Sequence, residues 1–250
     1  MITLDIRSEL PKAIHWTDGL VKQLPWAIAK AMTESAKKSQ VALKAQTPRY
    51  VNKPTRFTMN STFVRYASPK KLEAWVGFKD FAPKGTPAAK YLQPMVGGEG
   101  RRPKSSERQL QQSGVLPAGS YIVPTGVTPL KLNQYGNLSG AAYTQVLSRL
   151  KAFGQQGYTA NVSGARRSQA KRSKRDYFVG RPGGLPLGIY GRVGKQSRGF
   201  HTVFYVTRQP QYRATFPVQK ILTSTFSNTL GKNLRNALER EMVYQAARGR

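Results

Sequence analysis

The residues of this chain whose types and spacing best suit chemistry are cations. A run of ten residues, 166–175, holds six Lys and Arg and no acid, namely Arg166, Arg167, Lys171, Arg172, Lys174 and Arg175. Clustered like charges repel one another unless anions screen them, and the phosphates of DNA or RNA are suitable anions. We therefore predict that this run contacts nucleic-acid phosphate. A solvated loop and a nuclear-import signal are the alternative interpretations.

A second, shorter basic patch is Arg101-Arg102-Pro103-Lys104, from which we take Arg101 and Arg102 as further phosphate candidates. Neither patch has aromatic residues interleaved with its cations, as stacking platforms for single strands do. Sequence-specific reading of a nucleic acid is therefore not expected.

Side chains suited to catalysis are sparse. The chain has two histidines, His15 and His201, and no cysteine. A serine triad needs a base and an orienting carboxylate; His201 and Asp176 offer both, but no nucleophile-elbow sequence accompanies them. The 11 carboxylates are scattered, unlike metal ligands, and Gly194-Lys195 lacks the hydroxyl and the upstream glycine of a Walker loop. We predict no catalytic residue, no cofactor and no metal, and hence no enzyme.

The overall charge favours a polyanionic partner. The 250 residues include 41 Lys and Arg against 11 Asp and Glu, a formal net charge of +30. A basic excess of this kind usually indicates nucleic-acid binding. Between Glu107 and Glu239 the only acid is Asp176, so that half of the chain is nearly all positive.

Composition limits where the protein works. Hydrophobic residues make up 39% of the chain, with 23 Gly and 16 Pro, which indicates a compact body with long polar extensions. The absence of cysteine excludes disulfides. No apolar run approaches the roughly 18 residues that span a bilayer, and the N-terminus lacks the basic and apolar regions of a secretion signal. We expect no membrane partner, and a protein that works in the cytosol or in an assembly built there.

A long C-terminal helix is the element around which we expect the rest to be organised. Apolar residues recur at every fourth position, at Val218, Leu222, Phe226, Leu230, Leu234, Leu238 and Met242. Because a helix turns about 100° per residue, this stripe drifts around the helix. We predict that the first half packs on this chain's own sheet and that the second half docks on another copy, with Leu234, Leu238 and Met242 in the interface. The alternative is a helix that bends or breaks near Gly231 and stays within one core.

Apolar patterns elsewhere predict an antiparallel sheet. Residues 2–6 alternate as a half-buried strand, and 62–66 and 72–81 are typical of a hairpin. Near the C-terminal end, a strand at 189–193 is expected to pair with 202–207 across a glycine-containing loop.

Two further features bear on packing. A helix over residues 26–45 presents one face of mostly small side chains, which lets another backbone come close: Ile28, Met32, Ala36, Ser39 and Leu43. In the second strand of the hairpin, Trp75 lies on the face opposite Val76. Trp75 is therefore exposed or covered by a partner, and we count it as an interface candidate.

The middle of the chain differs in character. Residues 82–176 are rich in Gly, Pro, Ser and cations, and they predict an inserted extended arm with one short helix at 139–153. Short strands at 121–123 and 177–179 would flank it.

These patterns together predict an α+β fold. An antiparallel sheet is packed by an N-terminal helix and a long C-terminal helix, with a long irregular basic insertion. Residues 1–81 and 177–250 together form one core domain in this prediction.

Three stretches carry a resemblance to a known family. They are residues 24–32 (LPWAIAKAM), 54–61 (PTRFTMNS) and 85–92 (GTPAAKYL). With the order of the expected elements, the first stretch resembles bacteriophage minor tail proteins of the lambda Z type. The other two stretches are similar to segments of uncharacterised phage virion proteins. The resemblance covers the general plan of the chain and brings no catalytic motif, and the arm at 82–176 makes this chain longer than typical members.

The resemblance implies a structural virion protein that completes the tail or joins it to the head. It would oligomerise as a ring, six-fold or a multiple of six, around the DNA channel. Its partners would be other neck and tail proteins and the genomic DNA, and it would be located in the virion after assembly in the host cytoplasm. The alternative is a cellular, sequence-independent nucleic-acid-binding protein, associated with the ribosome or the nucleoid.

Overall fold

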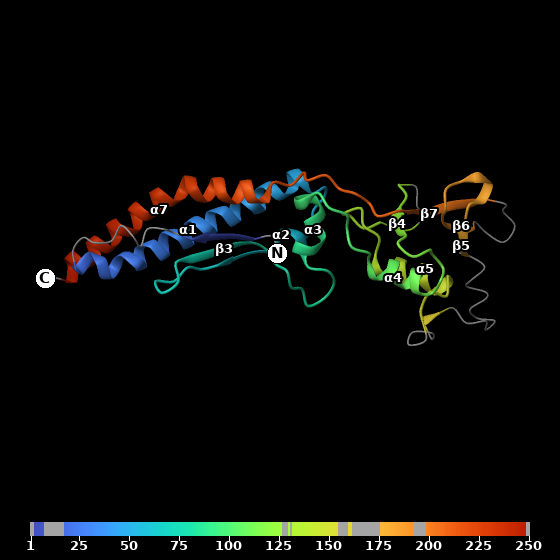
Figure 1. The fold of residues 1–250 in the computed structure, drawn as a ribbon, viewed down its shortest axis with the longest axis horizontal. Helices are drawn as coiled ribbons and strands as arrows, with labels where there is room; N and C mark the ends of the chain where they lie inside the picture. Colours follow the sequence, from blue (N-terminus) through green and yellow to red (C-terminus); the bar gives the residue numbers. More distant parts are fainter. Residues whose placement is uncertain are drawn as a thin grey trace. The chain divides into compact units, whose positions relative to one another are not determined.

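The chain combines helices with antiparallel sheets in two compact units. The computed structural model describes residues 3–7, 18–126, 130, 132–154, 160–161, 176–192 and 199–248. Unit 1 comprises residues 1–99 and 212–250, and unit 2 comprises residues 100–211 (Figure 1). The predicted α+β class is confirmed.

Two long helices of unit 1, α1 (Asp18–Tyr50) and α7 (Val218–Arg248), lie side by side and run antiparallel (Figure 1). α7 begins directly after Pro217, whose carbonyl accepts a hydrogen bond from the Ile221 N–H at 3.1 Å, and it continues through Gly231 without a break. α1 begins earlier than predicted and contains Pro25. The helical apolar pattern upstream of Pro25 continues across it, at the loss of one main-chain hydrogen bond.

The predicted small-residue face of α1 is confirmed. Its members are all buried, at 2% exposure or less: Ile28, Met32, Ala36, Ser39 and Leu43. The backbone of α7 comes close enough for the Ser39 hydroxyl, at 3.3 Å from the Leu222 carbonyl oxygen, to donate a hydrogen bond to it. Further along, the Asn233 side-chain amide donates to the Ser35 hydroxyl at 2.8 Å.

The sheet of unit 1 has three antiparallel strands in the order β1-β3-β2. They are β1 (Thr3–Arg7), β2 (Thr62–Arg65) and β3 (Glu73–Phe78). Ala74, Val76 and Phe78 of β3 point into a core shared with both long helices, which confirms the predicted hairpin and its buried face. Two short helices accompany the sheet, α2 (Arg56–Met59) and α3 (Ala88–Gly97).

Unit 2 is built on a four-stranded antiparallel sheet in the order β4-β7-β6-β5. Its strands are β4 (Tyr121–Pro124), β5 (Tyr177–Gly180), β6 (Gly188–Arg192) and β7 (Phe200–Thr207). The predicted pairing of the last two strands is confirmed, with a β-bulge beside Ile189 and Tyr190. A short 3-10 turn, Pro182–Gly184, links β5 to β6.

The division of the chain differs from the predicted one. Residues 177–207 were expected in the core domain of the terminal segments, yet they belong to unit 2. The reason is that β4 and β5, the flanking strands of the predicted arm, are the two edges of the same sheet as β6 and β7. Helices α4 (Ser105–Gln112) and α5 (Gly140–Arg149) add a core to that sheet, so the predicted arm holds more than one helix.

Candidate nucleic-acid interface

The strongest sequence candidate, the basic run at 166–175, lies outside the described residues. The prediction that Arg166, Arg167, Lys171, Arg172, Lys174 and Arg175 contact phosphate stays a prediction. The search for an interface therefore starts from the described cations of unit 2.

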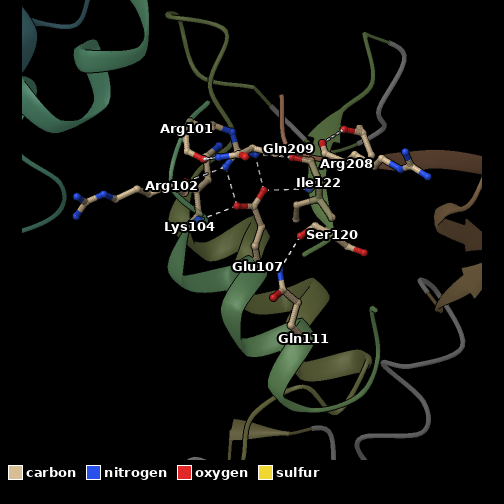
Figure 2. A network of polar contacts seen from close by, with 10 residues as sticks. Arg101, Arg102, Lys104, Glu107, Gln111, Ser120, Ile122, Arg208 and Gln209 are labelled. Carbon is tan, nitrogen blue, oxygen red and sulfur yellow. Dashed lines mark hydrogen bonds and ion pairs between the residues drawn. The ribbon is translucent and has the colours of Figure 1, made fainter. Parts of the chain in front are cut away.

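Arg101 serves the fold of unit 2 rather than standing free for phosphate. Its two terminal nitrogens donate to the two carboxylate oxygens of Glu107 at 2.7 and 2.5 Å (Figure 2). The Glu107 side chain is completely buried, and the Arg101 guanidinium also lies 4.8 Å from the centre of the Tyr121 ring. A bidentate pair of this kind fixes both side chains. The predicted phosphate role of Arg101 is replaced by this contact.

The ion pair completes the free edge of the sheet. β4 is an edge strand, and the outward Ile122 N–H donates to Glu107 Oε1 at 2.9 Å. The Ile122 carbonyl accepts from Arg101 at 3.4 Å, and the Lys104 main-chain N–H donates to Glu107 Oε2 at 2.6 Å. The pair occupies the place of a neighbouring strand, and it protects an edge that would otherwise offer unpaired main-chain groups.

These contacts set the protonation states of the cluster. Burial raises the pKa of Glu107, but the hydrogen bonds from Arg101, Lys104 and Ile122 and the charge of Arg101 outweigh it, so the pKa lies below its ordinary value. The pKa of Lys104 is lowered, chiefly by burial and also by the charge of Arg101. Glu107 is therefore ionised at neutral pH, and its charge is matched by Arg101.

Both acids of unit 2 lie beside an arginine of the same unit. Besides Glu107, residues 100–211 contain only Asp176, whose Oδ1 is 3.9 Å from Arg149 Nη1. Several other described cations of the unit are exposed: Arg102, Arg108, Lys151, Arg181, Arg192 and Arg208. The predicted candidate Arg102 is among them, and its side chain points away from Glu107 (Figure 2). Unit 2 holds no third acid with which these cations could pair.

Two of these cations line a depression at one end of the sheet. It has a volume of about 610 Å³ and includes Arg181, Arg208, the loop before β4 and the turn between β5 and β6. None of its lining residues is acidic. Arginines bind phosphate oxygens well because the guanidinium is planar and permanently charged. The lining of the depression therefore has the chemistry that a phosphate group requires.

Sequence reasoning missed Arg181 and Arg208 because each stands alone in the chain. A usable signal existed in their positions. Arg181 directly follows β5 and Arg208 directly follows β7. Since β6 is antiparallel to both, β5 and β7 run in the same direction, and their C-terminal ends lie at the same end of the sheet.

The predicted subunit-interface residues divide into two groups. Leu234 and Leu238 pack inside the chain, against Ala27 and Ala31 of α1. The prediction that they dock on another copy is corrected. The apolar stripe turns gradually around α7, and a long helix packed alongside can stay in contact with such a stripe, whereas a flat sheet cannot. Met242 is 58% exposed.

The remaining interface candidate, Trp75, lies on the face of β3 that points away from the core, as predicted. It is partly exposed, and the Arg65 guanidinium lies 5.8 Å from the centre of its ring.

The described residues hold few groups suited to catalysis. No three His, Cys, Asp or Glu side chains of this part of the chain come together as a metal site. The ring of His201 in β7 lies over Gly191 of β6, where an added Cβ would approach Nε2 to 2.3 Å. The glycine makes room for the histidine, which is a packing role. Within the described ranges no helix has both the length and the apolar character to cross a membrane.

No protein-family model, curated protein or solved structure matches this chain.

Proposed function

We propose that this chain is a structural subunit of a bacteriophage tail or head–tail neck, which oligomerises as a ring with unit 2 beside DNA. The class is supported by the resemblance of residues 24–32 and of the order of elements to minor tail proteins of the lambda Z type. The similarity of residues 54–61 and 85–92 to segments of phage virion proteins also supports it. The observation that carries the proposal is the charge of unit 2. Its two acids already lie beside arginines, while its exposed cations have no further acid in the unit.

A polyanion beside unit 2 relieves this imbalance. Cations clustered on a small unit repel one another, and each contact with a phosphate releases a condensed counterion from the nucleic acid. The contact reads charge rather than base sequence. DNA that passes along a tail or neck is such a partner.

The end of the helix pair in unit 1 favours self-association. Trp26 near the start of α1 and Met242 and Val243 near the end of α7 are exposed, the last at 70%. Ala27 packs close to Ala237, so these residues belong to the same end of the antiparallel pair. Exposed apolar residues at one end of a helix pair are suited to an interface, and a second copy is the partner that a ring supplies.

The double substitution Met242→Glu with Val243→Glu is expected to break self-association. The wild-type protein should sediment as an oligomer at micromolar concentration, and the variant as a monomer. Because the chain carries a net charge of +30, added carboxylates lower general repulsion. Dissociation must then come from lost apolar contact. Val41→Glu is the matched control, since Val41 is 67% exposed on α1 away from this end, and it should leave the mass unchanged.

A wild-type protein that sediments as a monomer at every concentration would contradict the ring. The alternative function, a cellular nucleic-acid-binding protein, requires no such assembly, and the same cations of unit 2 support it. Copurification separates the two classes: RNA retained at moderate salt favours the cellular protein, and retention of other virion proteins favours the tail or neck subunit.

The double substitution Arg181→Ala with Arg208→Ala is expected to weaken binding to duplex DNA of arbitrary sequence. If each arginine contacts one phosphate, the slope of log affinity against log salt should fall by about 2. Fluorescence anisotropy with labelled DNA over a salt series measures the slope. Arg235→Ala with Arg240→Ala, on the exposed side of α7, removes equal charge from unit 1. An equal change of slope in both variants would rule out a phosphate site in the depression.

A further inference from the structure

The two faces of the four-stranded sheet of unit 2 are covered differently. On one face, Leu110 of α4 and Val146 and Leu147 of α5 pack with Ile122, Ile189 and Phe204 as one core. This face is the inside of the unit.

Strand register places a set of aromatic residues on the opposite face. Directly paired residues share a face, and successive residues alternate. Phe178 pairs with Tyr190, Phe200 with Arg192, and Tyr205 with Gly188, whereas Ile189 pairs with Phe204 on the core side. Phe178, Tyr190, Arg192, Phe200 and Tyr205 therefore lie on the face away from α4 and α5. We call these five residues the aromatic face.

The aromatic face is rigid. The rings of Phe178 and Tyr190 stack with centres 5.8 Å apart, and Phe200 meets Tyr190 edge-on at 5.7 Å. Tyr190 is fully buried, and its hydroxyl donates to the Pro186 carbonyl at 2.5 Å. Its ring lies over Gly188, where an added Cβ would come within 3.0 Å of it. Tyr190 thus fixes its two neighbours in place.

Its outer rings are partly exposed, and two arginines belong to the same part of the sheet. Phe200 and Tyr205 are each 39% exposed. The Arg192 guanidinium lies 5.5 Å from the centre of the Phe178 ring, and Arg181 directly follows β5. Phe200 approaches the turn at Gly183, and this turn continues into the depression that Arg181 and Arg208 line.

We propose that the aromatic face binds single-stranded nucleic acid, with bases stacked on Phe200 and Tyr205 and phosphates beside Arg192 and Arg181. Exposed aromatic rings on an open sheet, with arginines between them, are the chemistry by which proteins hold unpaired bases. A duplex keeps its bases stacked within itself and gains nothing from these rings. An acidic protein partner fits less well, because flat exposed rings match flat bases.

The two basic patches lack interleaved aromatic residues. Aromatic and basic residues come together instead on the sheet, where three strands contribute them. Phe178, Arg192 and Phe200 are distant in the chain and become neighbours through strand pairing. The inference does not depend on the proposed tail or neck role.

The test compares single strands with duplex on the full-length protein. Fluorescence anisotropy is measured with labelled oligothymidine, oligouridine and a duplex, each of roughly 20 residues per strand, a length that covers a typical site. Phe200→Leu with Tyr205→Leu keeps apolar side chains and removes the rings. It should weaken single-strand binding by about tenfold or more, since stacking contributes about 1–3 kcal/mol per base, and leave duplex binding nearly unchanged. Loss on either single strand supports the proposal.

Matched controls lie in unit 1. Tyr212→Leu removes a ring that is 39% exposed, as Phe200 and Tyr205 are. Arg65→Ala removes a guanidinium that lies over the ring of Trp75, and it is the control for Arg192→Ala in unit 2. Neither control should change single-strand affinity, whereas Arg192→Ala should lower it and reduce its salt dependence. Thermal unfolding confirms that each variant is folded.

Three results would overturn the proposal: an equal loss on duplex and single strands, an unchanged single-strand affinity in the folded Leu variant, or no binding of either single strand. Sedimentation of the same samples keeps the two proposals apart. A failed aromatic face leaves the oligomer intact, and a failed ring leaves single-strand binding intact.

Discussion

Replacing Glu107 with Gln is expected to destabilise unit 2 by about 3–5 kcal/mol, because breaking one partner of a buried ion pair leaves an uncompensated charge. The carboxylate accepts from both Arg101 nitrogens and from the main-chain N–H groups of Lys104 and Ile122. A Gln amide can accept at one oxygen only, and its NH₂ group would face one of these donors. The outward main-chain groups of β4 would then lose part of their hydrogen bonding to the ion pair.

The loss is measurable separately from unit 1. The two described tryptophans, Trp26 and Trp75, belong to unit 1, and unit 2 contains no tryptophan in its sequence, so tryptophan fluorescence follows unit 1. Hydrogen exchange of the peptides that cover α4 and β4 follows unit 2. We expect exchange of these peptides to rise strongly in Glu107→Gln while the tryptophan transition keeps its midpoint. Glu34→Gln is the control, because Glu34 pairs with Lys37 on the surface and should contribute less than about 1 kcal/mol.

The same variant gives a pH signature. The pKa of Glu107 is lower in the folded unit than its ordinary value of 4.5. A depressed carboxyl pKa contributes stability that is fully present above the unfolded pKa and is lost as pH falls through the folded pKa. The stability gap between wild type and Glu107→Gln should therefore narrow as pH falls below about 4.5. A gap that stays constant from neutral pH down to pH 2 would mean that folding does not lower the pKa of Glu107.

Unit 1 was predictable because each of its main elements has a recognisable pattern in its own stretch of sequence. Each pattern reflects one periodicity and one partner surface. The patterns are the four-residue repeat after Pro217, the small-residue face from Ile28 to Leu43 and the alternation around Trp75. The four-residue repeat of α7 did not indicate which surface its apolar residues would pack against. Leu234 and Leu238 find it on α1, since two long antiparallel helices can cover each other along their length.

Unit 2 was not predictable in the same way. Its sheet takes its edges from β4 and β5, which stand far apart in a sequence rich in Gly and Pro. Pairing of this kind depends on long-range contacts that no local pattern encodes. Glu107 carried one signal that could have been used. A lone acid among many cations is expected to be buried with one of them, and Arg101 in the neighbouring patch was the nearest choice.

Phe216→Ala is expected to destabilise unit 1 by about 3–5 kcal/mol, the usual cost of removing a buried phenylalanine ring. Phe216 is 1% exposed, and its ring stacks on Tyr50 at 5.0 Å and meets the edge of Phe78 at 5.9 Å. It thereby joins the end of α1 to the sheet, directly before α7 begins. Its main-chain N–H donates to the Met95 carbonyl at 3.0 Å, which ties the same point to α3.

The midpoint of the tryptophan transition in urea should fall in Phe216→Ala, while exchange of the α4 and β4 peptides stays at its wild-type level. Phe81→Ala is the control, because Phe81 is 74% exposed and its loss should change stability by no more than about 0.5 kcal/mol. Together with Glu107→Gln this variant forms a reciprocal pair, one for each unit. If either substitution moved both transitions equally, the two units would unfold as a single cooperative body, and a division made from packing alone would not describe how the chain folds.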